Sequence, residues 1–147
     1  MLLAGSLAAG ILGAVFDQVT VTLSPEYFVI GKGLDAATGL RAQAAWLGFR
    51  AALPLGALIT GVGLWRACTS RRFSWQRWLS SIAGVFAAAL LPCAMLVAAL
   101  DPFDVRAIHP PDGAGTGTRF LLTWGLHLGA YLGVALGIAV ALRSSRN

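Results

Sequence analysis

Four long apolar stretches, separated by short polar segments, divide the chain of 147 residues. They run over about residues 1–19, 44–65, 79–100 and 120–142. A helix needs roughly 20 apolar residues to cross the hydrocarbon core of a bilayer, and these stretches are close to that length. In lipid every backbone polar group must be satisfied by the protein, and a helix does this within one segment. The pattern therefore predicts an all-α fold over 1–147, a single membrane domain in the form of a four-helix transmembrane bundle.

The first stretch has the length of a signal peptide but lacks the basic residues with which a signal peptide begins. We therefore interpret it as a retained span. Residues 19–23 then alternate between apolar and polar side chains, which is typical of an extended segment. This alternation predicts that the first helix ends near residue 19.

A short helix is expected in the segment that follows. Ser24 can act as N-cap, Pro25 suits the first helical position because its missing N–H would be unpaired there, and Glu26 faces the positive end of the helix dipole. Gly31 and Gly33 are of the type that commonly ends a helix. Because the two aromatic residues after Glu26 favour the lipid–water boundary, we expect this helix to be interfacial, in the first outer loop.

The connecting segments differ in charge. The 66–77 loop and the C-terminal tail contain six arginines and no acid, whereas all six acids lie in the 17–43 and 101–119 connections. Lysine and arginine collect on the cytoplasmic flanks of membrane spans. The sequence therefore predicts that both termini are cytoplasmic and that the two acid-containing connections lie outside.

Composition supports the membrane class and argues against others. Apolar residues make up 57% of the chain and charged residues 12%, against about 25% charged in soluble proteins. The net charge of +5 alone would suit a nucleic-acid-binding protein, but the arginines stand at the ends of spans, where topology explains them. We therefore expect the lipid bilayer as partner and no nucleic acid.

The sequence offers little for catalysis. Neither GxSxG nor HExxH occurs, and the two cysteines, Cys68 and Cys93, form no CxxC pair. We therefore predict no catalytic residues, no cofactor and no metal site, and we do not expect an enzyme.

Arg50 stands inside the second apolar stretch, about six residues or roughly 9 Å from its outer end. A charge at that depth is costly, so one interpretation is a functional arginine with an acidic partner. The other is an arginine whose long side chain reaches back to the outer surface. Pro54 adds to the first interpretation, because it leaves the carbonyl group of Arg50 without its helical donor.

His127 lies at a matching depth in the fourth stretch, with Tyr131 one turn further along the same face. Asp17 and Glu26 stand at the outer ends of neighbouring elements. Together with Arg50, these residues predict a polar cluster in the outer half of the bundle. The cluster would be either a ligand pocket or proton-handling site, or a polar staple that holds the helices and the outer loop together.

The fourth stretch carries a stripe of glycines at intervals of four residues. The stripe consists of Gly125, Gly129, Gly133 and Gly137. Such a glycine zipper lets a second helix approach closely. The approaching helix would be either in the same chain, with Gly61 and Gly63 of the second stretch as candidates, or in a protein partner or second copy of the chain.

Two segments carry a resemblance. Asp17-Gln18 is followed by Ser24-Pro25-Glu26-Tyr27-Phe28, and His127 is followed by Tyr131-Leu132-Gly133. These segments resemble a family of small, uncharacterised bacterial four-span membrane proteins with an outer His-Asp-Gln … Ser-Pro-Glu-Tyr-Phe motif. Phe16 stands where that family has histidine, which weakens a metal or proton role for this position. The resemblance implies a bacterial inner-membrane location, adds Gln18 and Tyr27 to the polar cluster, and brings no known activity.

Three functions are compatible with these observations. The first is a non-enzymatic accessory, assembly or scaffold subunit that acts at its outer face. The second is a small oligomeric transporter or channel, and the third is a lipid-binding protein or membrane enzyme. The inner halves of the spans contain little besides apolar and small residues, which argues against a polar path across the membrane. We therefore favour the first.

Overall fold

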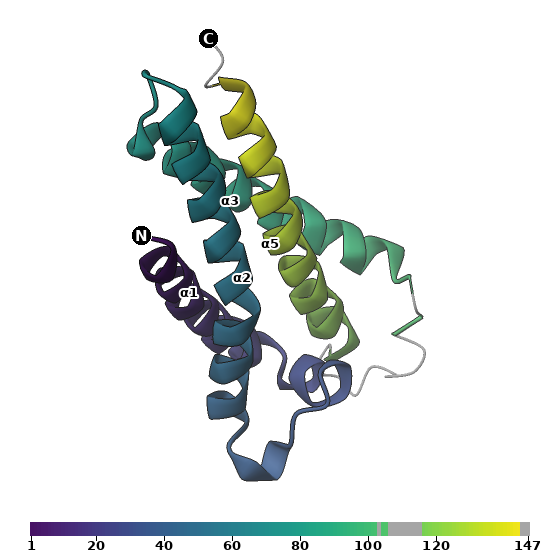
Figure 1. The fold of residues 1–147 in the computed structure, drawn as a ribbon. Coiled ribbons are helices and arrows are strands. Elements are labelled where there is room, and N and C mark those ends of the chain that lie inside the picture. The colour runs from purple at the N-terminus through teal and green to yellow at the C-terminus, as the bar shows by residue number, and fades with distance from the viewer. Residues whose placement is uncertain (103, 106–115, 145–147) are drawn as a thin grey trace.

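The computed structural model describes residues 1–102, 104–105 and 116–144 (Figure 1). Its four long helices are α1 Leu2–Leu23, α2 Leu40–Thr69, α3 Trp75–Leu100 and α5 Thr116–Ser144. Each contains a segment long and apolar enough to cross a membrane. The expected all-α four-helix fold is confirmed, and the chain is a multi-pass integral membrane protein.

Helix α1 is longer than the sequence predicted. It continues through Leu23, so the expectation of an extended segment over 19–23 is wrong. The hydroxyl groups of Thr20 and Thr22 donate to the carbonyl oxygens of Phe16 and Gln18, at 3.1 and 2.8 Å. Both hydroxyl groups thus find a hydrogen-bond acceptor within the helix. Alternation over five residues is too short to distinguish a strand from a helix whose threonines bond to their own backbone.

The expected helix in the first connection is present. It starts at Pro25, and its main part is the π-helix η1 over Tyr27–Gly31. Ser24 caps it, because its hydroxyl oxygen accepts from the backbone N–H of Tyr27 at 3.3 Å. The chain then leaves the helix through Gly33, whose φ of +68° lies in the left-handed region that favours glycine. A 3₁₀ turn, η2 Ala36–Thr38, leads into α2.

The first hairpin pairs α1 with α2 through small residues. A Cβ atom on Gly13 would lie 2.6 Å from Cβ of Ala52, and one on Gly56 would lie 2.6 Å from Cβ of Ala9. These separations are too short for real side chains, so the close approach of the two backbones requires glycine at both positions.

The second hairpin pairs α3 with α5 through the glycine stripe. A Cβ atom on Gly125 would lie 2.5 Å from Cα of Ala94, and one on Gly133 would lie 2.7 Å from Cα of Phe86. The stripe therefore packs within the chain, but against α3. Its suggested partners on α2 are wrong, because Gly61 faces α1 and Gly63 faces the start of α3.

The two hairpins meet near both of their ends. At one end, an apolar cluster joins α1, η1, α2 and α5, and it contains Val21, Tyr27, Phe28 and Ala44. At the other end, Trp78 and Ile82 of α3 and Ala141 of α5 pack against Ile59 and Val62 of α2. The Trp78 Nε1–H also donates to the Ile59 carbonyl oxygen at 3.3 Å.

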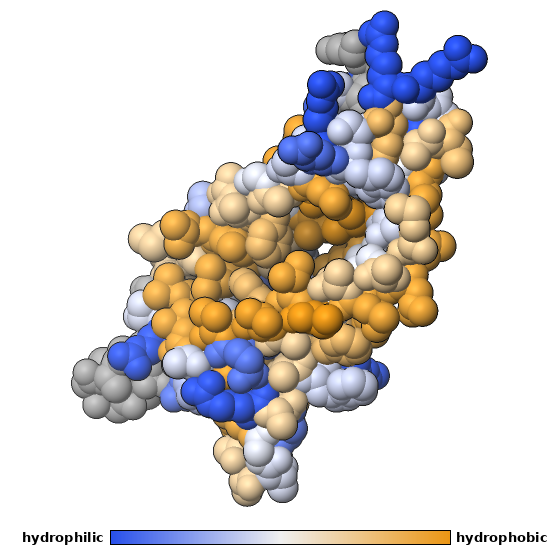
Figure 2. Space-filling view, turned by 90° about the vertical axis from the view of Figure 1, so that its left-hand side faces the viewer, coloured by the Kyte–Doolittle hydropathy of each residue, from blue (hydrophilic) through white to orange (hydrophobic). Residues whose placement is uncertain are grey.

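The bundle has two polar ends and an apolar middle. The turn between α2 and α3 and the C-terminal end of α5 lie together at one end, while η1, η2 and the first turns of α2 and α5 lie at the other (Figure 1). On the face shown in Figure 2, hydrophobic side chains cover the surface between the ends, and hydrophilic residues gather at the ends. We call the end that contains η1 the η1 end.

Candidate functional site

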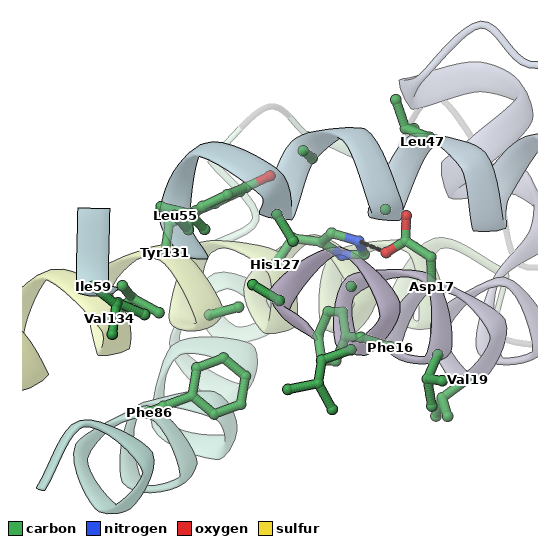
Figure 3. A pocket seen from close by; sticks show the side chains of 18 of the residues that line it. Phe16, Asp17, Val19, Leu47, Leu55, Ile59, Phe86, His127, Tyr131 and Val134 are labelled. Carbon is green, nitrogen blue, oxygen red and sulfur yellow. Dashed lines mark hydrogen bonds and ion pairs between the residues drawn. The ribbon is translucent and has the colours of Figure 1, made fainter. Parts of the chain in front are cut away.

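A pocket of about 630 Å³ lies between the two hairpins, and all four long helices contribute to its lining. The face shown in Figure 2 is hollowed, and hydrophobic residues surround the opening. Of the described residues that line it, four have polar side chains: Asp17, Lys32, His127 and Tyr131. The others are apolar or glycine, including Phe16, Leu55, Ile59, Phe86 and Val134 (Figure 3).

The pocket is elongated and polar at one end. On α2 the lining runs from Leu47 to Ile59, which corresponds to about 18 Å at 1.5 Å per residue. The end near Leu47 holds the Asp17 carboxylate, which lies against Gly48. The end near Ile59 is lined by Ile82 and its apolar neighbours from α3. A molecule that fills the pocket would therefore have a polar group only at the η1 end.

The main polar feature is a buried pair that joins the two hairpins. Asp17 of α1 and His127 of α5 are 4% and 8% exposed, and Asp17 Oδ1 lies 3.0 Å from His127 Nε2 (Figure 3). The other ring nitrogen, Nδ1, lies 2.9 Å from the carbonyl oxygen of Thr123, one turn earlier on α5. Both ring nitrogens are thus engaged, and the ring orientation is set from two sides.

These contacts give both side chains of the pair a hydrogen-bond partner. A carbonyl oxygen can only accept, so Nδ1 of His127 donates to the Thr123 carbonyl oxygen. The hydrogen bond between His127 Nε2 and the Asp17 carboxyl group offsets part of the cost of burying two polar groups in an apolar surrounding.

Aromatic rings enclose the His127 imidazole. The ring centroids of Phe16, Tyr27 and Phe28 lie 5.2, 4.8 and 5.8 Å from the centroid of His127. Burial raises the pKa of the Tyr27 hydroxyl, and the neighbouring Tyr131 and Asp17 raise it further. Tyr27 is therefore a neutral phenol, and η1 acts as an apolar cover over the pair.

Gly48 of α2 makes room for the carboxyl group of Asp17. A Cβ atom at this position would lie 2.8 Å from both Cγ and Oδ2 of Asp17. Asp17 therefore contacts α2 within its own hairpin and His127 in the other hairpin. This residue couples the packing of the first hairpin to the contact between hairpins.

The structure brings together part of the expected polar cluster. Asp17, Tyr27 and His127 are in contact, and Tyr131 extends along the pocket toward the pair (Figure 3). Gln18 lies at the edge, where its side-chain amide donates to the Arg41 carbonyl oxygen at 2.8 Å and ties α1 to the start of α2.

Glu26 and Arg50 lie apart from the pair. The Glu26 carboxylate accepts from the hydroxyl of Ser24 at 3.1 Å. Arg50 is exposed on α2 and its guanidinium lies 6.0 Å from the ring centroid of Trp46. Within the described part of the chain it forms no ion pair. This geometry corresponds to the interpretation in which arginine reaches back toward the membrane surface.

Sequence reasoning missed Lys32, Thr123 and Gly48 as parts of this site. Thr123 stands four residues before His127, a spacing at which a backbone carbonyl can accept from a histidine ring. Gly48 forms a stripe of small residues with Ala52 and Gly56 at intervals of four, which is as regular as the stripe on α5. Lys32 is the only lysine of the chain, a signal that composition alone could have drawn attention to.

The polar side chains of the site are joined by hydrogen bonds. Among the residues that the structure describes, no three His, Cys, Asp or Glu side chains are placed to hold a metal ion. Comparisons with protein-family models, with curated proteins and with solved structures found no match to this chain.

Proposed function

We propose that this membrane protein binds a lipid between its two hairpins, with the acyl chain in the pocket and the head group at the Asp17–His127 pair. The observation that carries this proposal is the pocket itself, apolar along its length and polar at one end. Its surroundings in a membrane are hydrocarbon, so a long apolar cavity that opens on this face is accessible to lipid chains. An amphipathic molecule matches both parts of the lining.

The length of the pocket supports an occupant from one leaflet. The hydrocarbon core of a bilayer is about 30 Å thick, so one leaflet contributes about 15 Å. The lining from Leu47 to Ile59 extends over about 18 Å, close to that value. A lipid whose head lies at the η1 end would thus place its chain along the pocket without crossing the membrane.

A lipid fits this lining better than an ion or a polar solute does. Beyond Tyr131 the pocket continues between Ile59, Ile82 and Phe86, and such a lining offers no ligands to a hydrated ion. A transporter of ions is therefore the weaker alternative. The accessory role expected from the sequence is compatible with lipid binding, because a subunit can present a bound lipid to its partner.

The orientation of the protein is part of this proposal. The arginines near the α2–α3 turn favour a cytoplasmic position for that end, and the η1 end would then lie outside, in a bacterial inner membrane. An impermeant maleimide added to intact cells should label a Thr38→Cys variant that also carries Cys68→Ser. It should leave Cys68 of the wild type unlabelled. The reverse labelling pattern would contradict this orientation.

The lipid proposal can be tested by blocking the pocket. Ala83 of α3 lines the pocket, whereas Ala88 of the same helix is exposed and does not. Native mass spectrometry of the protein, extracted in mild detergent and washed, should show one retained lipid molecule per wild-type chain. Ala83→Trp should lose this lipid, and Ala88→Trp should retain it.

The two tryptophan variants are compared only if both give the helical circular dichroism and the elution volume of the wild type. Absence of a retained lipid in the wild type, after washing that leaves the protein folded, would refute the proposal. So would equal retention by both variants, because the lipid would then be bound to the outer surface.

A further inference from the structure

Of the four polar side chains that line the pocket, two are available to bind a polar ligand group. Asp17 and His127 are hydrogen-bonded to each other, so each already has a partner. Within the described residues, the Lys32 ammonium and the Tyr131 hydroxyl form no hydrogen bond or ion pair with another side chain. The polar end thus offers one positive charge and one neutral donor.

Lys32 is placed to meet a ligand head at this end. Its Nζ lies 5.4 Å from the ring centroid of Tyr27, and that ring lies 4.8 Å from the His127 ring. Among the described residues that line the pocket, Lys32 is the one lysine or arginine. Arg50 points elsewhere, toward Trp46, and does not line the pocket.

Resting on the proposed lipid binding, we propose that the ligand is a single-chain lipid with a carboxylate head, a long-chain fatty acid. Lys32 would form the ion pair, and the Tyr131 hydroxyl would donate to the carboxylate. One unpaired positive charge and one neutral donor complement a singly charged anion with two acceptor oxygens.

The size of the pocket argues for one chain. Its volume of about 630 Å³ lies within the range of roughly 300–1,000 Å³ found for pockets that hold one small ligand. A phospholipid with two chains and a glycerol backbone needs more room than this. The lining follows α2 from Leu47 to Ile59, so one straight chain laid along this helix would contact it throughout.

The head group can be tested with ligands that differ only there. The purified protein in detergent is titrated with radiolabelled palmitate, with hexadecanol as the neutral molecule of equal chain length and phosphatidylglycerol as the two-chain anion. We expect palmitate to bind at least about tenfold more tightly than hexadecanol, as an added charge-assisted hydrogen bond would give.

Variants assign this preference to Lys32. Lys32→Met should weaken palmitate binding about tenfold and leave hexadecanol binding unchanged, whereas Lys32→Arg should keep the preference for palmitate. Arg50→Met removes a cation from the same half of the bundle and should change the affinity for neither ligand. Because Lys32 is the only lysine, its acetylation can be followed on one peptide, and palmitate should protect it.

The outcomes separate the two proposals. If no lipid binds and Lys32 is never protected, the proposed lipid binding itself fails. If palmitate and hexadecanol bind equally in the wild type and in Lys32→Met, lipid binding stands and the carboxylate assignment is overturned. If phosphatidylglycerol displaces palmitate at lower concentration, the ligand is a membrane phospholipid, and the assignment to a fatty acid is also overturned.

Discussion

The interior of each hairpin and the seam between the two hairpins are built in opposite ways. Within a hairpin, glycines such as Gly13 and Gly133 bring two backbones so close that no side chain fits between them. At the seam the hairpins meet through an aromatic and apolar cluster near each end and through the hydrogen bond between Asp17 and His127. The volume left between these clusters is the pocket.

This difference separates two roles: the hairpins supply most of the packing that stabilises the fold, and the seam between them can bind a ligand. Lipid tails are as apolar as helix surfaces, so helices in a membrane associate through close packing and hydrogen bonds. Within each hairpin, the two helices associate through close packing. The seam depends more on a few bonds, above all Asp17 to His127, and a loosely packed seam can hold a ligand.

The largest effect is expected inside a hairpin. A Cβ atom on Gly133 would lie 2.7 Å from Cα of Phe86, so Gly133→Leu would force α3 and α5 apart and cost about 3 kcal/mol of folding free energy, as severe overpacking does. Gly84→Leu is the matched control, because nothing lies within 4 Å of a Cβ atom there. Thermal unfolding followed by circular dichroism in detergent would reveal the difference. Equal melting temperatures of the two variants would contradict the close packing of this hairpin.

A smaller effect is expected at the seam. Asp17→Ala leaves His127 buried without its partner and should cost about 2 kcal/mol, whereas Asp17→Asn can donate to Nε2 and should cost about half as much. A double-mutant cycle with His127→Ala measures the coupling between the two residues. If the two losses simply add, the pair does not hold the hairpins together.

The smallest effect concerns the cover formed by η1. Because burial raises the pKa of Tyr27 in the folded state, the unfolded chain releases this proton first as the pH rises. The contribution of Tyr27 to stability is therefore complete below the ordinary tyrosine value of about pH 10 and is lost as the pH rises further. Melting temperatures between about pH 8 and pH 11 should fall more steeply for the wild type than for Tyr27→Phe. Parallel curves would mean that Tyr27 is not buried in the folded protein.

Much of the fold follows from sequence, because long apolar runs and helix caps are local signals. The four spans and the cap at Ser24 depend on residues close together in the chain, and they were predicted. The C-terminal end of α1 was not predicted, because Thr20 and Thr22 are compatible with a strand and also with a helix in which their hydroxyl groups bond to the backbone. Local pattern does not decide between such alternatives.

The site was predicted only in part, for a geometric reason. Depth along a span can be counted in sequence, so Arg50 and His127 are predicted at matching depths, with Asp17 at the outer end of a neighbouring span. Rotation of each helix about its axis and the choice of neighbour cannot be counted in this way. The sequence therefore groups Arg50 with the pair, whereas the structure places its guanidinium beside Trp46 and places Lys32 in the lining of the pocket.

The helical fold with four membrane crossings follows from the amino-acid sequence, because the apolar stretches are long enough to span a bilayer and a helix pairs its own backbone groups in lipid. The pairing of the helices does not follow from it, because small-residue stripes are present on several helices and fit more than one neighbour. The contact between Asp17 and His127, across 110 positions of the chain, likewise arises only in the folded bundle. The pocket is a property of that pairing, since it exists only where two closely packed hairpins are held apart.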